Sequence, residues 1–116
     1  MQDLKTRAKK FALDVIRFTR TLPKGEEFTI IKRQLIRSAT SVAANYRATQ
    51  QAKSKADFIS KLGTVEEEAD ESLFWLETLQ ELAMRTNAEL ERLLTEANEL
   101  VSIFVTSRRT ARNPIN

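Results

Sequence analysis

Residues 54–83 read SKADFISKLGTVEEEADESLFWLETLQELA and contain no proline. Small or apolar residues recur in this stretch at intervals of four and three: Phe58, Leu62, Val65, Ala69, Ser72, Leu76, Leu79 and Ala83. This spacing places them on one face of an α-helix. Ser54, followed three residues later by Asp57, is typical of a capping box at a helix start. The stretch therefore predicts one long helix over residues 54–85.

The same spacing recurs on both sides of this stretch. It predicts further helices over residues 3–21, 26–49 and 87–107. Pro23 and Gly25 interrupt the pattern between the first two helices, and Thr86 with Glu89 resembles a second capping box before the last. No stretch alternates apolar and polar residues over the length of a strand. We therefore expect an all-α protein, an antiparallel up-down-up-down four-helix bundle formed by residues 1–107.

Residues 108–116 have lost the apolar face of the helix before them. They contain three arginines, Arg108, Arg109 and Arg112. A short basic segment with nothing to bury is typical of a frayed terminus, so we expect a disordered tail.

Composition excludes several kinds of chemistry. The 116 residues include no cysteine and no histidine, so disulfides, thiolate metal sites and the commonest general base are absent. Carboxylate metal sites in helical bundles use Glu-x-x-His motifs, which this sequence lacks. We expect no enzymatic activity, no metal and no cofactor. The sequence has no apolar run of the roughly 20 residues that span a bilayer, which favours a cytoplasmic protein with no membrane partner.

The charges divide along the chain. Residues 1–55 hold 13 Lys or Arg against 4 Asp or Glu, whereas residues 56–107 hold 3 against 12. Oppositely charged halves attract, within one copy or between copies. If unlike patches meet between copies, the contact is heterologous and repeats into a ring or a filament. The alternative is that these charges are solvated or paired within the chain, where each exposed pair stabilises little.

Several apolar residues lie away from the predicted core faces. Phe74 points roughly 160° from the face of its helix that carries Leu76, and Trp75 and Leu82 lie roughly 100° from it. Ile36 and Ala43 lie to the side of the preceding helix's core face. Scattered exposed apolar residues are ordinary, but aromatic residues are enriched where surfaces associate. These five residues are the predicted oligomer interface.

Two polar sets complete the candidate sites. Asn45 occupies an apolar position of the heptad-like series, and with Tyr46 and Arg47 we expect it to form a register-fixing network with Glu67, Asp70 or Glu71; a ligand pocket is the alternative. The candidate nucleic-acid contacts are the basic residues on the outer faces of the first two helices and in the tail: Lys5, Lys9, Lys10, Arg17, Arg20, Lys32, Arg33, Arg37, Arg108, Arg109 and Arg112. Few aromatic residues lie among them, so any RNA or DNA binding is expected to be salt-sensitive and sequence-nonspecific.

Three boxes resemble a known bacterial family. They are ANYR at residues 44–47, SKADF at 54–58 and ESLFWLE at 71–77, within a similarity from about Phe11 to Leu100. The chain resembles the four-helix-bundle proteins encoded in intervening sequences of large-subunit (23S) ribosomal RNA genes, which are related to the accessory variability determinant of diversity-generating retroelements. Relatives often have glycine at the position of Ala43. The resemblance implies a homopentameric ring without an established biochemical activity, and makes a nucleic-acid or protein partner plausible.

Together these observations favour a non-enzymatic oligomeric scaffold or adaptor. The alternative is an accessory protein that binds nucleic acid through the basic faces and the tail.

Overall fold

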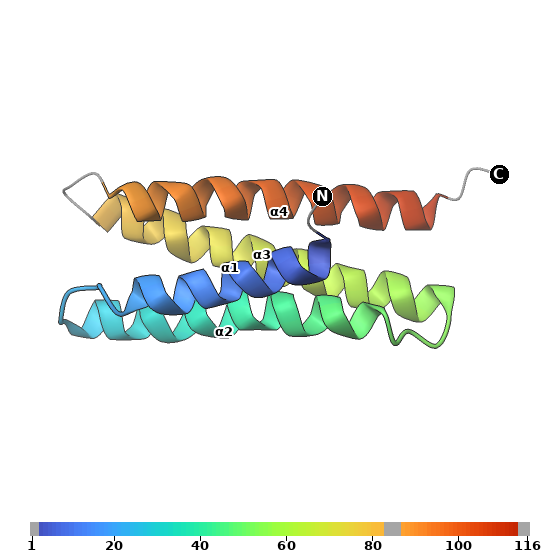
Figure 1. The fold of residues 1–116 in the computed structure, drawn as a ribbon, viewed down its shortest axis with the longest axis horizontal. Coiled ribbons are helices and arrows are strands. Elements are labelled where there is room, and N and C mark those ends of the chain that lie inside the picture. The colour runs from blue at the N-terminus through green and yellow to red at the C-terminus, as the bar shows by residue number, and fades with distance from the viewer. Residues whose placement is uncertain (1–2, 83–86, 114–116) are drawn as a thin grey trace.

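The computed structural model of the chain describes residues 3–82 and 87–113. Four helices account for most of them: α1 (Leu4–Thr19), α2 (Glu26–Thr49), α3 (Lys55–Leu82) and α4 (Ala88–Arg112) (Figure 1). The described ranges contain no strand. The all-α fold with four helices is therefore confirmed; Ala83 and Thr86, which were predicted to belong to a core face and a capping box, lie outside the described residues.

Polar side chains cap three of the helices. Asp3 Oδ1 accepts a hydrogen bond from the Thr6 N–H at 2.8 Å, and Asn87 Oδ1 accepts one from the Leu90 N–H at 3.1 Å. At α3, Ser54 Oγ accepts from the Asp57 N–H at 3.0 Å, which confirms the predicted cap. These oxygens satisfy N–H groups that have no partner in the first helical turn, and so fix where each helix begins.

The turn before α2 depends on Gly25. Its φ of 146° lies where residues with a Cβ are strained, and no other described residue has a positive φ. A Cβ at this position would also lie 2.8 Å from the Glu27 carboxylate. Glycine here lets the chain leave Pro23 and enter α2 in a short connection.

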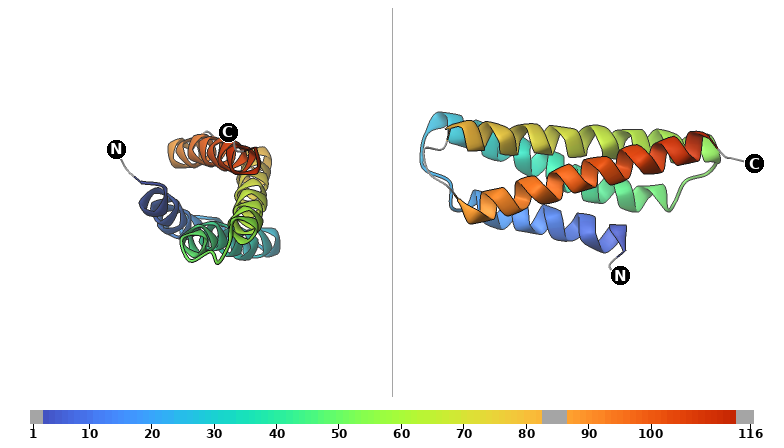
Figure 2. Two further views of the ribbon diagram at one scale, coloured as in Figure 1. Left: turned by 90° about the vertical axis from the view of Figure 1, so that its right-hand side faces the viewer. Right: turned by 90° about the horizontal axis from the view of Figure 1, so that it is seen from above.

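The helices follow one another around a common core. The view along the long axis shows α1, α2, α3 and α4 in that order around the centre (Figure 2), and the molecule measures 51 by 23 by 21 Å. The 0%-exposed side chains include Val15 from α1, Leu35 and Val42 from α2, Leu76 from α3 and Phe104 from α4. Each helix therefore contributes its predicted apolar face to one core.

A pair of small residues lies in the α2/α3 contact. Ser38 and Ser72 are fully buried, and Ser72 Oγ lies 2.9 Å from Ser38 Oγ. Each hydroxyl also bonds a carbonyl of its own helix, that of Leu35 for Ser38 and that of Glu68 for Ser72. Their hydrogen bonds are thus satisfied inside the core, and their size lets the two helices approach closely.

Arginine side chains join α1 to α4 across the remaining side of the bundle. Arg7 forms ion pairs with Glu96 and Glu99, both at 2.7 Å, and Arg92 reaches Asp14 at 3.1 Å. Burial opposes ionisation of Asp14, but hydrogen bonds from Lys10 and Arg92 outweigh it and lower the pKa of this carboxyl. Opposite charges from the two halves of the chain therefore pair within one copy at this contact.

The predicted disordered tail is wrong for residues 108–112, because α4 continues to Arg112. Arg108 lies against α3 and pairs with Glu66 at 3.1 Å, which fixes the last turns without an apolar stripe. Arg109 and Arg112 in the final turn also interact favourably with the negative end of the helix dipole. A membrane-crossing helix must be both long and apolar, and none in the described part of the chain is.

Candidate functional site

Apolar side chains reach the surface along the outer side of α3. Phe74 is 54% exposed and Leu82 46% exposed, and Phe74 meets the Trp75 ring edge-to-face with ring centroids 4.8 Å apart. We call Phe74, Trp75 and Leu82 the aromatic ridge. An edge-to-face pair has a preferred geometry and adds to the stability of the arrangement, so the ridge presents a preformed aromatic surface.

Trp75 holds the ridge to the body of the molecule. It is half-buried and packs against the core cluster, and its Nε1–H donates a hydrogen bond to Glu71 Oε2 at 3.1 Å. Arg37 pairs with the same Glu71 and, at 3.0 Å, with Glu68. The hydrogen bond from Arg37 lowers the pKa of Glu71, more than its partial burial raises it. Trp75 thus anchors the aromatic ridge to the bundle, and Phe74 is the exposed part of the ridge.

Arg37, Glu68, Glu71 and Trp75 form one cluster, which we call the Arg37 cluster. It is found in place of the predicted polar network. Asn45 donates to the backbone carbonyl of Ser41 at 2.9 Å and to Ser41 Oγ at 2.8 Å, within its own helix. Of the predicted carboxylates only Glu71 joins an α2/α3 cluster, and its α2 partner is Arg37. The reason is the position of each residue along the helix axis. Arg37 precedes Ser38, which meets Ser72 across the α2/α3 contact, so Arg37 lies level with Glu71. Asn45 lies two turns further along α2.

The other members of that predicted network lie apart. Tyr46 packs against Phe104 with ring centroids 5.6 Å apart, and burial raises the pKa of its hydroxyl. Arg47, Glu67 and Asp70 are exposed, and none of them forms an ion pair within residues 3–82 and 87–113. Sequence periodicity indicated which residues face outward, but not how far each lies along the neighbouring helix.

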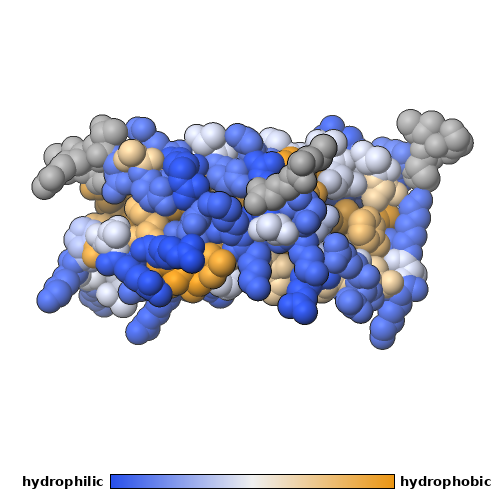
Figure 3. Space-filling view, viewed as in Figure 1, coloured by the Kyte–Doolittle hydropathy of each residue, from blue (hydrophilic) through white to orange (hydrophobic). Residues whose placement is uncertain are grey.

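A groove of about 280 Å³ lies between α1 and α2. Six of its lining residues are small or apolar: Ala12, Leu13, Ile16, Thr40, Ala43 and Ala44. The other three are the cations Lys5, Lys9 and Arg47. We call this the basic groove. Figure 3 shows hydrophobic residues reaching the surface among hydrophilic ones on the face of the molecule along which α1 runs.

The predicted interface residues therefore divide between two surfaces. Phe74, Trp75 and Leu82 form the aromatic ridge, and Ala43 lies in the basic groove. Ile36 is half-buried on α2 and belongs to neither. Ile30, 52% exposed, and Leu13, 40% exposed, are surface apolar residues that were not among the predicted interface residues.

Unpaired charges differ in sign between the two surfaces. Within the described residues, Glu67, Asp70, Glu77 and Glu81 on α3 form no ion pair, nor do Lys5, Lys9 and Arg47 around the groove. All seven are exposed. The other candidate basic contacts divide: Lys10 and Arg17 pair with Asp14, whereas Arg20, Lys32 and Arg33 are exposed without a described acidic partner.

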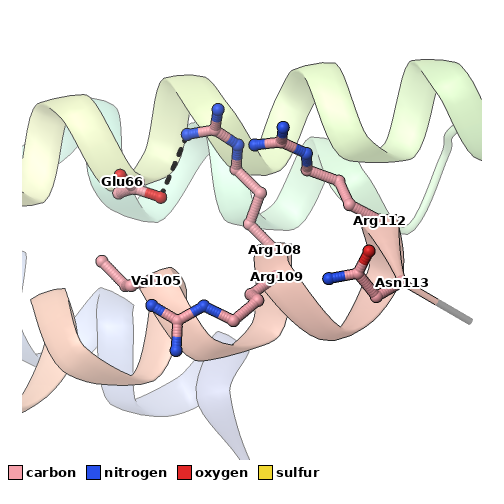
Figure 4. A pocket seen from close by; sticks show the side chains of 6 residues that line it. All are labelled: Glu66, Val105, Arg108, Arg109, Arg112 and Asn113. Carbon is pink, nitrogen blue, oxygen red and sulfur yellow. Dashed lines mark hydrogen bonds and ion pairs between the residues drawn. The ribbon is translucent and has the colours of Figure 1, made fainter.

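A second cavity, of about 360 Å³, lies between α3 and the end of α4. Its lining residues are Glu66, Val105, Arg108, Arg109, Arg112 and Asn113 (Figure 4). Arg108 and Arg112 project from the same side of α4 towards α3, and Arg109 lies along the other flank (Figure 4). We call this the arginine pocket; it brings together the three arginines that were predicted to lie in a disordered tail.

The two cavities present mainly cationic and apolar groups. Within the part of the chain that the structure describes, no three His, Cys, Asp or Glu side chains come close enough to hold a metal ion. The basic groove is lined by cations, apolar groups and the hydroxyl of Thr40, and the arginine pocket has one carboxylate, which is already paired. The two surfaces can bind other molecules, through apolar contact and charge.

Comparison with known proteins identifies a family and a solved structure to which the chain is similar. The family model described as "23S rRNA-intervening sequence protein" matches residues 2–106. The fold is similar to a crystal structure of a protein with unknown function from the S23 ribosomal protein family of Bacteroides thetaiotaomicron, with a TM-score of 0.83. The two are 30% identical over 93% of this chain and 100% of that one. No curated protein matches the sequence.

Proposed function

The chain belongs to the family of 23S rRNA-intervening sequence proteins, and from that premise we propose that it acts as a self-assembling scaffold without enzymatic activity. The observation that carries the proposal is the exposed aromatic ridge. A 54%-exposed Phe74 anchored by a half-buried Trp75 is costly to leave in water, and aromatic anchors of this kind dominate protein interfaces.

The ridge of one copy docks in the basic groove of the next. The groove lining includes three small side chains, Ala12, Ala43 and Ala44, which leave room for a large aromatic side chain. The lining also carries three cations, whereas unpaired carboxylates such as Asp70 and Glu77 flank Phe74. Apolar contact at the centre and opposite charges at the rim are the usual composition of a specific interface.

Such a contact joins two different patches, so each copy uses one patch on either side. A heterologous contact of this kind generates a closed ring when the rotation per copy divides a full turn. The resemblance to intervening-sequence proteins supports five copies, each an antiparallel up-down-up-down bundle in the cytoplasm. A ring of five gives roughly five times the subunit mass of 13.3 kDa, and its repeated surface serves as a platform for a partner.

The experiment that tests the proposal combines two single-surface variants. Phe74→Glu places a carboxylate on the ridge, and Leu13→Glu places one in the groove, where it repels the acidic flanks of an incoming ridge. Each variant alone is expected to run as a 13.3 kDa monomer in size-exclusion chromatography with light scattering. Ser102→Glu, an equal charge change at an exposed position of α4, is the control and keeps the wild-type mass.

Mixing the two variants gives the sharper result. Each retains one intact surface, so the intact ridge of Leu13→Glu docks in the intact groove of Phe74→Glu, and a complex of two copies forms. Further growth is blocked because the remaining surfaces are both damaged. A wild-type protein that is monomeric at physiological ionic strength would refute the scaffold; an unchanged oligomer in either variant would refute this interface.

Binding of nucleic acid is the second candidate function, favoured by the exposed basic residues without a described acidic partner. Arg20, Lys32 and Arg33 are exposed and do not line the basic groove. Their contacts would be to phosphates, so affinity for RNA or DNA should fall steeply with added salt and vary little with sequence. Fluorescence anisotropy with labelled RNA and DNA over a salt series tests this, and no binding at about 50 mM salt would refute it.

A further inference from the structure

The arginine pocket concentrates like charges that the described residues do not neutralise. Arg108, Arg109 and Arg112 line it with one carboxylate, Glu66, whose Oε1 lies 3.1 Å from Arg108 Nη1. Arg109 and Arg112 form no ion pair within residues 3–82 and 87–113. Like charges one helical turn apart, as Arg108 and Arg112 are, repel and destabilise a helix unless an anion lies between them.

Arg108 is positioned by the surface beneath it. Its side chain crosses α3 at Gly63: a Cβ built on Gly63 would lie 3.7 Å from Arg108 Nε and 3.8 Å from Cζ. Glu66 then holds one end of the guanidinium, and the side chain remains 31% exposed. Gly63 and Glu66 thus orient Arg108 while leaving part of its planar fork open to the pocket.

Arg112 completes the arrangement from the next turn of α4. Its guanidinium points in the same direction as that of Arg108, and the two lie on the same side of α4 (Figure 4). Two adjacent forks can each donate a pair of N–H groups to one anion. The helix dipole disfavours an anion on the axis beyond the C-terminus, but the pocket opens at the side of α4, between it and α3.

We propose that the arginine pocket binds phosphate groups. A phosphate offers three acceptor oxygens and a charge of up to −2, so Arg108 and Arg112 can contact it together, whereas one fork alone suffices for a carboxylate. The volume of about 360 Å³ exceeds that of a phosphate, so the group can be part of a larger molecule. The pocket lies apart from the aromatic ridge and the basic groove, and this proposal does not depend on self-assembly.

The alternative explanation is structural: basic residues in the last turn of a helix stabilise it through the dipole alone. The two explanations differ at Glu66. If the arginines serve only α4, replacing Glu66 removes a stabilising ion pair and has no bearing on ligands. If they bind phosphate, Glu66 competes with the ligand for Arg108, so Glu66→Gln strengthens binding.

The experiment measures two probes on the full chain. Inorganic pyrophosphate is titrated by isothermal calorimetry, and a fluorescein-labelled RNA by anisotropy, both at about 50 mM salt. Arg112→Gln is expected to weaken binding about tenfold through the loss of charge-assisted hydrogen bonds. Lys24→Gln, an equal charge change at an exposed residue in the connection between α1 and α2, is the matched control and should stay within about twofold. Circular dichroism and thermal unfolding show whether each variant retains its helices.

The outcomes separate the sources of the phosphate. Loss of both probes in Arg112→Gln, with a gain in Glu66→Gln, supports a general phosphate site; the same pattern with RNA alone identifies a polynucleotide backbone, and with pyrophosphate alone a small free phosphate. Absence of binding by the wild type, or equal losses in Arg112→Gln and Lys24→Gln, would overturn the proposal. Repeating the titration with Phe74→Glu keeps the result distinct from that of the assembly experiment, because that variant leaves the pocket intact.

Discussion

The two halves of α3 use their outer sides differently. In the first half, Lys55–Ala69, Asp57 pairs with Lys61, Glu66 with Arg108 and Glu68 with Arg37. In the second half, Asp70–Leu82, Phe74 and Leu82 are exposed, and Glu77 and Glu81 form no ion pair with any described residue. One continuous helix thus pairs most of the carboxylates of its first half within the chain, Glu67 excepted, and exposes large apolar side chains in its second half.

Charges that are paired within the chain and apolar groups that stay exposed have different consequences for association. An ion pair between two residues of the same chain balances both charges, so neither residue needs a partner on another molecule. An exposed aromatic ring flanked by unpaired carboxylates gains when another surface covers it. The exposed apolar residues in the second half of α3 are therefore the feature of this helix that packing within a monomer explains least well.

The largest difference in unfolding free energy is expected between substitutions on opposite faces of the second half of α3. Leu76 is fully buried and Phe74 is 54% exposed, although they are only two positions apart in the sequence. Leu76→Ala should lower the free energy of unfolding by about 2–5 kcal/mol, because it leaves a cavity in the core. Phe74→Ala should lower it by less than about 0.5 kcal/mol, because this ring packs on the surface.

Urea unfolding followed by circular dichroism, at the lowest workable protein concentration, measures both changes separately from assembly. Light scattering on the same samples should show the reverse order: Phe74→Ala reduces the oligomeric mass, and Leu76→Ala does so only where it unfolds the subunit. Equal losses of unfolding free energy in the two variants would contradict the division of α3 into a structural and a binding side.

A smaller effect, of opposite sign, is expected in the first half. Gly63 lies within α3, where glycine costs about 1 kcal/mol relative to alanine because it increases the freedom of the unfolded chain. The nearest atoms to an added Cβ belong to Arg108, at 3.7–3.9 Å, which is ordinary contact. Gly63→Ala should therefore raise the free energy of unfolding by about 0.5–1 kcal/mol.

Thermal and urea unfolding provide the measurement for Gly63→Ala. Gly25→Ala is the contrasting control, because a φ of 146° strains any residue with a Cβ and that variant should be destabilised. If Gly63→Ala were destabilised as well, the backbone of α3 would need glycine for a closer approach than the one the structure has.

Periodicity alone was enough to predict the four helices. The stretch predicted as 26–49 is observed as Glu26–Thr49, and that predicted as 54–85 as Lys55–Leu82 up to the limit of the described residues. The end of α4 was missed because the apolar stripe stops near Phe104, whereas the helix is held further on by Arg108, Glu66 and the dipole. Where a helix ends on charge rather than on apolar contact, the hydrophobic pattern does not mark it.

The candidate sites were predicted only in part for a related reason. Helical angles indicated correctly that Phe74 points outward, because that depends on one helix alone. The partners of Glu71 depend on how α2 and α3 are aligned along their contact, and the periodicity within each helix carries no information about that alignment. Asn45 was consequently paired with the wrong carboxylates, and the Arg37 cluster was not foreseen.

The smallest effect concerns Glu71, at the boundary between the two halves. Arg37 lowers the pKa of this carboxyl in the folded state, so the unfolded chain binds its proton at a higher pH. The stabilisation is complete above the ordinary pKa of a glutamate and is lost as the pH falls through the lowered value. Because the carboxyl is partly exposed, this stabilisation amounts to less than about 1 kcal/mol.

Glu71→Gln should therefore lower the free energy of unfolding only slightly at pH 7, and it should flatten the decline in stability below about pH 5. Urea unfolding across that pH range measures the effect, and Glu77→Gln, at a carboxylate without a described ion pair, is the control that keeps the wild-type slope. The comparison tests whether the paired charges of α3 stabilise the fold and the unpaired ones do not.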